Sequence, residues 1–169
     1  MAYENPRQAG SQRGGWQDTR ISIDVSDIKL GDELPDQIFA DIAQSKARII
    51  AQAGAMNKNN KSSQLRKFYD ELVMWQDKVA FEQGSDAKKQ GSDAKTLKYK
   101  ELAPYIKMMA AKVAYAKGRK HVDDCFEQLF AHTIRQIKDP QTLKHAKLFM
   151  EAFMGFYKAE EKTDSKGEQ

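Results

Sequence analysis

The sequence predicts an all-α protein: a compact bundle of about five helices with a flexible N-terminal tail. Apolar residues recur at spacings of three and four over five stretches, which is the period of an amphipathic helix. The connections between these stretches are short, and no two segments alternate convincingly enough to pair as strands. The 169 residues are 40% hydrophobic and 31% charged, as expected for one globular domain.

The composition divides the chain into a domain with two tails. A flexible tail is expected over residues 1–30, because residues 1–20 are rich in glycine and glutamine, although Ile21, Ile23 and Val25 alternate like a short extended segment. The helical bundle is expected over residues 31–158, and the charged residues 159–169 are expected to be frayed. Inside the bundle, GSDAKKQ is followed at once by GSDAK at 84–95, which predicts a mobile surface loop.

The first two helices are expected on either side of a basic, asparagine-rich loop. The first begins around Leu34-Pro35, because proline is tolerated in a first turn, and it stops near Gly54. Ser62 or Ser63 is expected to cap the second helix, which runs to about Phe81. The predicted buried face of the second helix contains Leu65, Phe68, Tyr69, Leu72, Trp75, Gln76 and Val79.

Three further helices complete the prediction. They are expected at about 98–119, at about 120–138 and from Asp139-Pro140 onward, where aspartate and proline mark a helix start. Their predicted core residues are Leu102, Ile106, Met109, Ala110 and Val113 in the third, Val122, Phe126, Leu129, Phe130, Thr133 and Ile137 in the fourth, and Leu143, Ala146, Met150, Phe153, Met154 and Tyr157 in the fifth.

The positive charge is concentrated in the middle of the chain. Residues 57–119 contain 14 basic and 7 acidic side chains, a net +7, whereas residues 1–56 carry −2 and residues 120–169 carry −1. A localised basic band favours a polyanionic partner. Lysines that only solvate two amphipathic helices would give the same composition, so charge alone leaves both interpretations open.

Several classes of protein are not supported by the sequence. The single cysteine, Cys125, excludes an internal disulfide, and no apolar run is typical of a signal peptide or a membrane span, so we expect a cytoplasmic protein. No nucleophile elbow, phosphate-binding glycine loop or dinucleotide fingerprint is present, so we expect neither catalysis nor a cofactor. His121, Asp124 and Cys125 can be drawn as the metal site of a hydrolase, but a structural zinc site needs four ligands at defined spacing.

Two basic features could contact a nucleic-acid backbone. On a helical wheel, Met108, Lys112, Tyr115 and Arg119 form one stripe almost opposite the buried face, where cations could bind phosphates and the ring could stack. The alternative is a solvated face on which Tyr115 packs against a neighbouring helix. The second feature is the start of the second helix, where cations and hydroxyls meet open N–H groups. Its candidate residues are Lys58, Lys61, Ser63, Gln64, Arg66 and Lys67.

Three stretches together resemble a known family. They are SSQLRKFYDEL at 62–72, ELAPYIKMMAAKVAYAKGR at 101–119 and FMEAFMGFYK at 149–158. In this order and spacing they resemble the small subunit of type III-A CRISPR effector complexes, the Csm small subunit, over about residues 34–158.

The resemblance implies a non-catalytic helical subunit, several copies of which stack in a ribonucleoprotein filament. Its partners would be guide RNA, target RNA and the other subunits of the complex, with no membrane, no metal and no cofactor. It would hold the target RNA and the guide–target duplex through sequence-independent backbone contacts, with Gln64, Arg66, Tyr115 and Arg119 matching the family's motifs. The residues alone also allow a helical protein–protein adaptor with no role in RNA binding.

Overall fold

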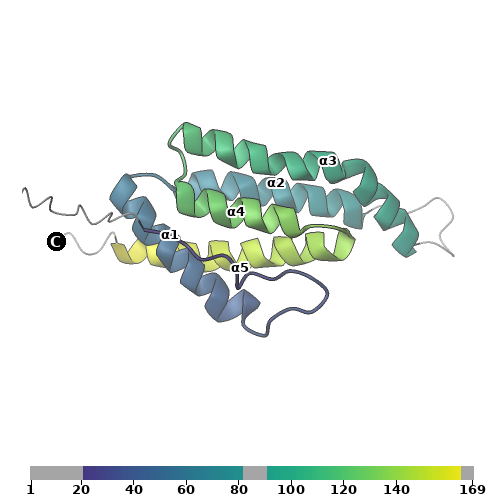
Figure 1. Cartoon of the computed structure of the whole chain (residues 1–169), viewed down its shortest axis with the longest axis horizontal. Helices are drawn as coiled ribbons and strands as arrows, with labels where there is room; N and C mark the ends of the chain where they lie inside the picture. Colours follow the sequence, from purple (N-terminus) through teal and green to yellow (C-terminus); the bar gives the residue numbers. More distant parts are fainter. Residues whose placement is uncertain (1–20, 82–90, 165–169) are drawn as a thin grey trace, which may run out of the picture.

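The structure, a computed structural model that describes residues 21–81 and 91–164, is a helical bundle without strands in these ranges, which confirms the predicted fold class. The chain forms a π-helical turn at Ile38–Ile42, then α1 (Ala43–Asn57), α2 (Ser62–Ala80), α3 (Gly91–Gly118), α4 (Asp124–Gln136) and α5 (Pro140–Asp164). Helix α5 packs against α1 and α2, while α3 packs against α4 and α2 (Figure 1).

The core is built from the faces that the helical periodicity predicts. Phe126 and Phe130 of α4 contact Phe68 of α2 at ring-centroid distances of 5.8 and 5.2 Å, and Phe153 of α5 lies 6.2 Å from Phe126. Each fully buried side chain of this kind stabilises the fold by about 1.5–3 kcal/mol. The predicted core residues that are buried are Leu65, Leu72, Val79, Leu102, Ile106, Met109, Val113, Val122, Phe126, Leu129, Phe130, Thr133, Ile137, Leu143, Ala146, Met150, Phe153 and Tyr157.

Polar side chains bind the free backbone groups at both ends of α4 and at the start of α5. Asp123 caps α4, since its Oδ1 accepts from the backbone N–H of Phe126 at 2.9 Å. Asp139 does the same for α5 through the N–H of Thr142 at 2.7 Å, as the Asp-Pro pair predicts. At the other end of α4, the ammonium of Lys107 donates to the carbonyls of Ile134, Arg135 and Ile137.

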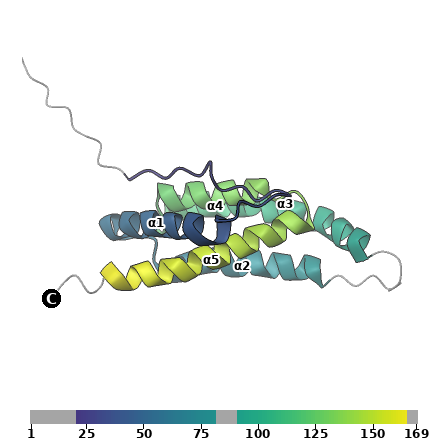
Figure 2. The same ribbon diagram turned by 90° about the horizontal axis from the view of Figure 1, so that it is seen from below.

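Residues 21–31 differ from the predicted tail, because they lie along α4 in the bundle. Ile28 and Leu30 are buried, and the side chain of Gln136 holds both: its Nε2 donates to the Ile28 carbonyl at 2.8 Å and its Oε1 accepts from the Leu30 N–H at 2.9 Å. His132 contacts the same Ile28 carbonyl at 3.0 Å. The apolar residues of this segment pack in or against the core, so residues 21–30 are part of the bundle and not of a tail. Residues 1–20 lie outside the described residues. Figure 2 shows the segment crossing the bundle.

Three helices also begin or end at residues other than those predicted. The second GSDAK, at 91–95, forms the first turn of α3, where the acidic Asp93 suits a helix N-terminus and alanine and lysine favour helix. The other part of the predicted mobile insert, residues 84–90, lies outside the described residues. At the C-terminus, residues 159–164 continue α5 instead of fraying, and Glu160 pairs with Arg48 of α1 at 3.6 Å. Helix α4 begins at Asp124 rather than near residue 120, because Lys120 has a positive φ of 59° that interrupts the helix.

The first helix starts later and ends later than predicted. Regular α-helix begins at Ala43, because Ala40 has non-helical φ and ψ of −118° and −105°. The helix then continues past Gly54 to Asn57, and Lys58 ends it in a left-handed conformation with φ of 56°.

Asn60 joins both loops at one end of the bundle to the helices around them. Its N–H donates to the His121 carbonyl at 3.1 Å, its Oδ1 accepts from the Asp123 N–H at 2.9 Å, and its Nδ2 donates to the Ile50 carbonyl at 3.3 Å. The Tyr157 hydroxyl of α5 donates to the Asn60 carbonyl. The two side-chain bonds and the bond from Tyr157 are buried, so Asn60 fixes the 57–61 loop against the 119–123 loop.

Gly54 leaves room for Asn60 and does not end α1. A Cβ atom at Gly54 would lie 2.9 Å from the Cβ of Asn60 and 3.0 Å from the backbone oxygen of Asn59, whereas a Cβ at Gly155 of α5 would meet nothing within 4 Å. The glycine therefore allows the loop to lie directly on the helix.

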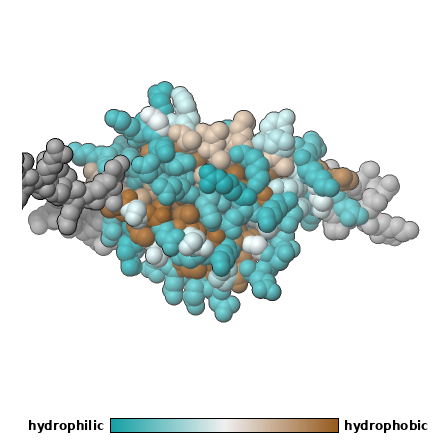
Figure 3. Space-filling model, viewed as in Figure 1, coloured by the Kyte–Doolittle hydropathy of each residue, from teal (hydrophilic) through white to brown (hydrophobic). Residues whose placement is uncertain are grey.

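Polar side chains cover most of the face seen in Figure 3, with smaller apolar areas between them. None of the described helices has both the length and the apolar composition to cross a membrane.

We expect Gly54→Ala to lower the free energy of unfolding by about 1–3 kcal/mol, because the added methyl group must displace loop backbone. Gly155→Ala is the matched control, and we expect it to be neutral or stabilising by up to about 1 kcal/mol, since alanine favours helix. Chemical denaturation measures both. Equal effects of the two substitutions would contradict the close approach of Asn60 to Gly54.

Candidate nucleic-acid interface

The stripe predicted on α3 lies on the outside of the bundle. Met108 is 48% exposed and Tyr115 is 67% exposed, so Tyr115 does not pack into a neighbouring helix. Lys112 is also exposed, but its ammonium lies 2.6 Å from a carboxylate oxygen of Glu71 on α2. This ion pair neutralises much of the charge that the sequence assigned to Lys112, and it ties α3 to α2.

Arg119 and Tyr115 form a unit at the end of α3. The guanidinium of Arg119 donates to the Tyr115 hydroxyl at 3.2 Å, and its Cζ lies 5.9 Å from the centre of the ring. Both contacts leave the positive charge intact, and the second is a cation–π contact. A planar cation held beside an exposed ring is suited to a phosphate and an adjacent base or sugar.

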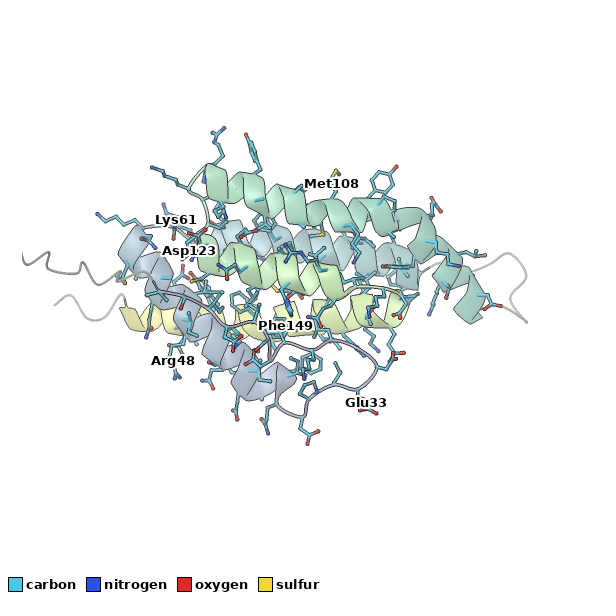
Figure 4. The ribbon with its side chains drawn as sticks, in the orientation of Figure 1. Glu33, Arg48, Lys61, Met108, Asp123 and Phe149 are labelled. Atoms are coloured by element: carbon cyan, nitrogen blue, oxygen red, sulfur yellow. The ribbon has the colours of Figure 1, made fainter. Side chains whose placement is uncertain are left out.

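Four cations gather at the end of the bundle that Asn60 fixes, and we call this surface the basic end. Lys58 and Lys61 come from the α1–α2 loop, and Arg119 and Lys120 come from the α3–α4 loop. All four are exposed, and no acidic side chain in the described part of the chain forms an ion pair with any of them. Figure 4 shows Lys61 and Asp123, one from each loop, at this same end.

The start of α2 differs from the prediction. Its N-cap residue is Lys61, without a side-chain cap, and Ser62 and Ser63 lie inside the helix. The carboxylate of Glu161 from α5 accepts from the Ser62 N–H at 3.4 Å and pairs with Lys158, whose ammonium lies 3.4 Å from the Ser62 hydroxyl. An acidic group of the protein thus already occupies the positive end of this helix, which disfavours a phosphate there.

The remaining candidates of α2 have local partners on its surface. Arg66 lies 3.6 Å from Asp70 one turn later, and both side chains are exposed. The Lys67 ammonium is 3.5 Å from Oε1 of Gln64, and Ser63 is exposed beside them. The structure therefore divides the predicted residues into the basic end, which brings two loops together, and a separate surface of α2.

The residues of the alternative metal site have other partners. Asp124 forms an ion pair with Lys117 at 3.2 Å, and the Cys125 thiol contacts the Ile21 carbonyl at 3.3 Å. Burial, with help from the neighbouring Asp123 and Asp124, raises the pKa of Cys125 to about 11. Among the described residues, no three His, Cys, Asp or Glu side chains gather so that they could hold a metal ion.

Lys120 and Asn60 are the residues of this site that sequence reasoning missed. The basic run from Lys117 to Lys120 was a signal for Lys120, but the fourth helix was expected to begin at about residue 120, which hid the turn that exposes this lysine. Nothing in the sequence singled out Asn60 among the neighbouring asparagines.

The described part of the chain is a small helical bundle with a cationic end. A family model described as Csm2 Type III-A matches residues 40–163, about three quarters of the chain. The chain therefore belongs to this family, and it is a small subunit of a type III-A CRISPR effector complex, which confirms the resemblance seen in the sequence. The comparisons with curated proteins and with solved structures found no match.

We expect Glu161→Gln to lower stability at neutral pH and to have little effect at low pH. Burial opposes ionisation of Glu161, but the hydrogen bonds from Lys158 and Ser62 hold its pKa below the ordinary 4.5. Because the folded pKa is the lower one, the charged group stabilises the fold above pH 4.5, and this contribution is lost as the pH falls through the folded value. The difference in unfolding free energy should be about 0.5–1 kcal/mol at pH 7, as measured by denaturation across pH 3–7. A constant difference over that range would contradict the ionic role of Glu161.

We expect Cys125 to react slowly with thiol reagents in the native state, because only the thiolate attacks and the raised pKa of Cys125 leaves little of it at pH 7. Labelling followed by mass spectrometry should accelerate strongly in denaturant. Native labelling as fast as that of the unfolded chain would contradict the buried position of this thiol.

Proposed function

We propose that this chain binds RNA as a non-catalytic subunit of its complex, in the cytoplasm. In this role several copies stack along the filament and hold the target RNA and the guide–target duplex by sequence-independent backbone contacts. The observation that carries the proposal is the basic end, where Lys58, Lys61, Arg119 and Lys120 lie exposed without described acidic partners. Membership of a CRISPR effector family supplies the RNA that such a surface can bind.

The arrangement of the cations supports contacts to phosphates rather than to base edges. Lysines bind phosphates as point charges on flexible side chains, and Arg119 is positioned by Tyr115. A few such contacts give weak binding that falls steeply with salt. Copies fixed along one filament bind more strongly together, because each later contact is effectively intramolecular. Guide–target pairing can then supply the sequence recognition.

The contacts of the cations within the chain support a ranking inside the proposed interface. Lys112 is bound by Glu71, whereas Arg119 contacts only a neutral ring and hydroxyl in the described part of the chain. A phosphate must displace Glu71 to bind Lys112, but it can bind Arg119 directly. Arg119 is therefore the central residue of the proposed interface, and Lys112 contributes less.

We expect Arg119→Ala to weaken binding of target RNA by the assembled complex, and to weaken it more than Lys112→Ala does. The slope of log K against log salt should become shallower by about 0.7–1 for each phosphate that a copy no longer binds. Lys144→Ala on α5 removes an equal charge from an exposed position away from the basic end and serves as the control. Binding is measured with purified complex over a salt titration.

Unchanged affinity and unchanged salt slope for Arg119→Ala, with normal assembly of the complex, would overturn the RNA-binding role and favour the protein–protein adaptor. Loss of assembly with Arg119→Ala would lead to the same conclusion. Equal losses for Arg119→Ala and Lys144→Ala would show only a general effect of net charge.

A further inference from the structure

Exposed apolar side chains gather where α2 and α3 lie side by side, towards the end of the bundle opposite the basic end. Trp75 of α2 stacks on Tyr105 of α3 at a ring-centroid distance of 5.9 Å, and the Lys78 ammonium lies 4.7 Å from the centre of the Trp75 ring. Seven large hydrophobic side chains are exposed in the described part of the chain, and five of them belong to this part of the two helices: Met74, Phe81, Leu97, Tyr105 and Met108. We call these five residues, with Trp75 and Lys78, the apolar face.

Helix α3 is apolar on two sides. Ile106 and Met109 are buried in the core, whereas Leu97, Tyr105 and Met108 are 65%, 52% and 48% exposed. Figure 4 shows Met108 on the outer side of the helix. A helix that is hydrophobic all round is usually covered on all sides, and a contiguous exposed apolar patch marks an interaction site. The outer side of α3 is therefore suited to contact with another protein surface.

The neighbouring surface of α2 is hollowed. A hollow of about 740 Å³ lies along this helix, and Met74, Lys78 and Phe81 line it together with Val73 and Asp77. Met74 and Phe81 are seven residues apart, which is two turns of helix and the spacing of side chains that pack against a second helix. The apolar face thus has a convex part on α3 and a concave part on α2.

Two contacts fix the levels of α2 and α3 relative to each other. The Lys112 ammonium of α3 lies 2.6 Å from a carboxylate oxygen of Glu71 on α2. Trp75, one turn later in α2, stacks on Tyr105, two turns earlier in α3. The two helices therefore run antiparallel, and a step forward along α2 corresponds to a step backward along α3.

These levels place opposite charges and apolar side chains at equal heights. Lys78 follows Trp75 by three residues and Glu101 precedes Tyr105 by four, so the two differ in height by only about 1.5 Å. Counted in the same way, the heights of Phe81 and Leu97 differ by about 3 Å. A two-fold axis parallel to the helices keeps every height and lays α3 of one copy on α2 of the other. Lys78 then meets Glu101 of the other copy, and Phe81 meets its Leu97.

The local partners of these two charges leave them available for such a contact. No acidic side chain in the described ranges forms an ion pair with Lys78, whose ammonium contacts only the Trp75 ring there. Glu101 is exposed and pairs within its own helix with Lys98 at 3.1 Å. Asp77 and Glu101 also disfavour a polyanion on this face, so we expect protein and not RNA to cover it.

We propose that two copies of the free chain pair through the apolar face about a two-fold axis parallel to the helices, with Lys78 of each copy beside Glu101 of the other. The inference goes beyond the RNA-binding role and leaves the basic end open. A two-fold contact closes after two copies, so it differs from the contact by which copies would stack along a filament. The face is smaller than the roughly 20–30 residues on each side of a standard interface, so the dissociation constant should be about 10–100 µM.

The first test is sedimentation equilibrium of the full chain from low micromolar to near-millimolar concentration. We expect a reversible equilibrium between monomer and dimer that stops at the dimer. A monomer at every concentration would overturn the proposal, and so would growth into larger oligomers, because a two-fold contact cannot extend.

A charge exchange tests which residues meet. We expect Lys78→Glu and Glu101→Lys each to raise the dissociation constant of the dimer about tenfold or more, because like charges then face each other across the interface. The two substitutions together should restore pairing, since the exchanged charges attract again. Lys144→Glu on α5 is the control for net charge, and thermal unfolding verifies the fold of each variant. Pairing that the combined variant does not restore would overturn the assignment.

An apolar substitution tests the same face without a change of charge. We expect Leu97→Gln to weaken the dimer about tenfold, because Leu97 is exposed in the free chain and buried in the pair. Met56→Gln at the end of α1 is the matched control, since Met56 is 63% exposed on another surface. Equal effects of the two substitutions would show that the dimer does not use the apolar face.

Other occupants of the apolar face would give different results. If the free chain is monomeric and Leu97→Gln prevents assembly of the effector complex, another subunit covers the face. If Leu97→Gln weakens RNA binding and leaves the dimer unchanged, RNA covers it. Either result overturns the pairing, whereas a negative result for Arg119→Ala rejects only the RNA-binding role.

Discussion

The hydrogen bonds of one buried asparagine hold together the end of the molecule on which its function is proposed to depend. Asn60 uses its N–H, carbonyl and both side-chain polar atoms to connect α1, the α3–α4 loop and α5. Because both side-chain bonds are buried, loss of the side chain would leave the Asp123 N–H and the Ile50 carbonyl without these partners. Gly54 is the second requirement, since any larger residue would push the loop away.

This junction has an electrostatic consequence. Lys58 and Lys61 are about sixty residues from Arg119 and Lys120 in sequence, and cations brought together in this way repel one another. The fold accepts this cost instead of neutralising them, although it pairs Lys112 with Glu71 and Lys117 with Asp124 and Glu127 nearby. A group of exposed cations brought together from two loops is a feature of a polyanion-binding site.

Much of the fold could be predicted from the sequence, because periodicity reports directly which helical face is buried. The helix cap at Asp139 and the core phenylalanines follow from local patterns. The cap at Asp123 was missed, because the fourth helix was expected to begin at about residue 120. The 21–30 segment could not be assigned, because its position depends on the distant Gln136 and His132. Gly54 resembles a helix terminator until Asn60 is placed against it.

The site was predictable only in part, because local periodicity does not specify contacts between segments that are distant in the sequence. The outward direction of Tyr115 and Arg119 follows from the period of one helix, and the structure confirms it. Pairing of Lys112 with Glu71, and the approach of Glu161 to the start of α2, are contacts between helices that no local pattern specifies. Residue-level contacts with RNA stay a prediction.

A structure of the assembled effector complex with guide and target RNA bound would measure the proposed role most directly. We expect the Arg119 guanidinium at hydrogen-bonding distance from a phosphate, with Lys61 and Lys120 following the same RNA. If these side chains face only protein, with every nucleotide farther away than the roughly 10 Å over which salt screens charge, RNA is not what this surface binds.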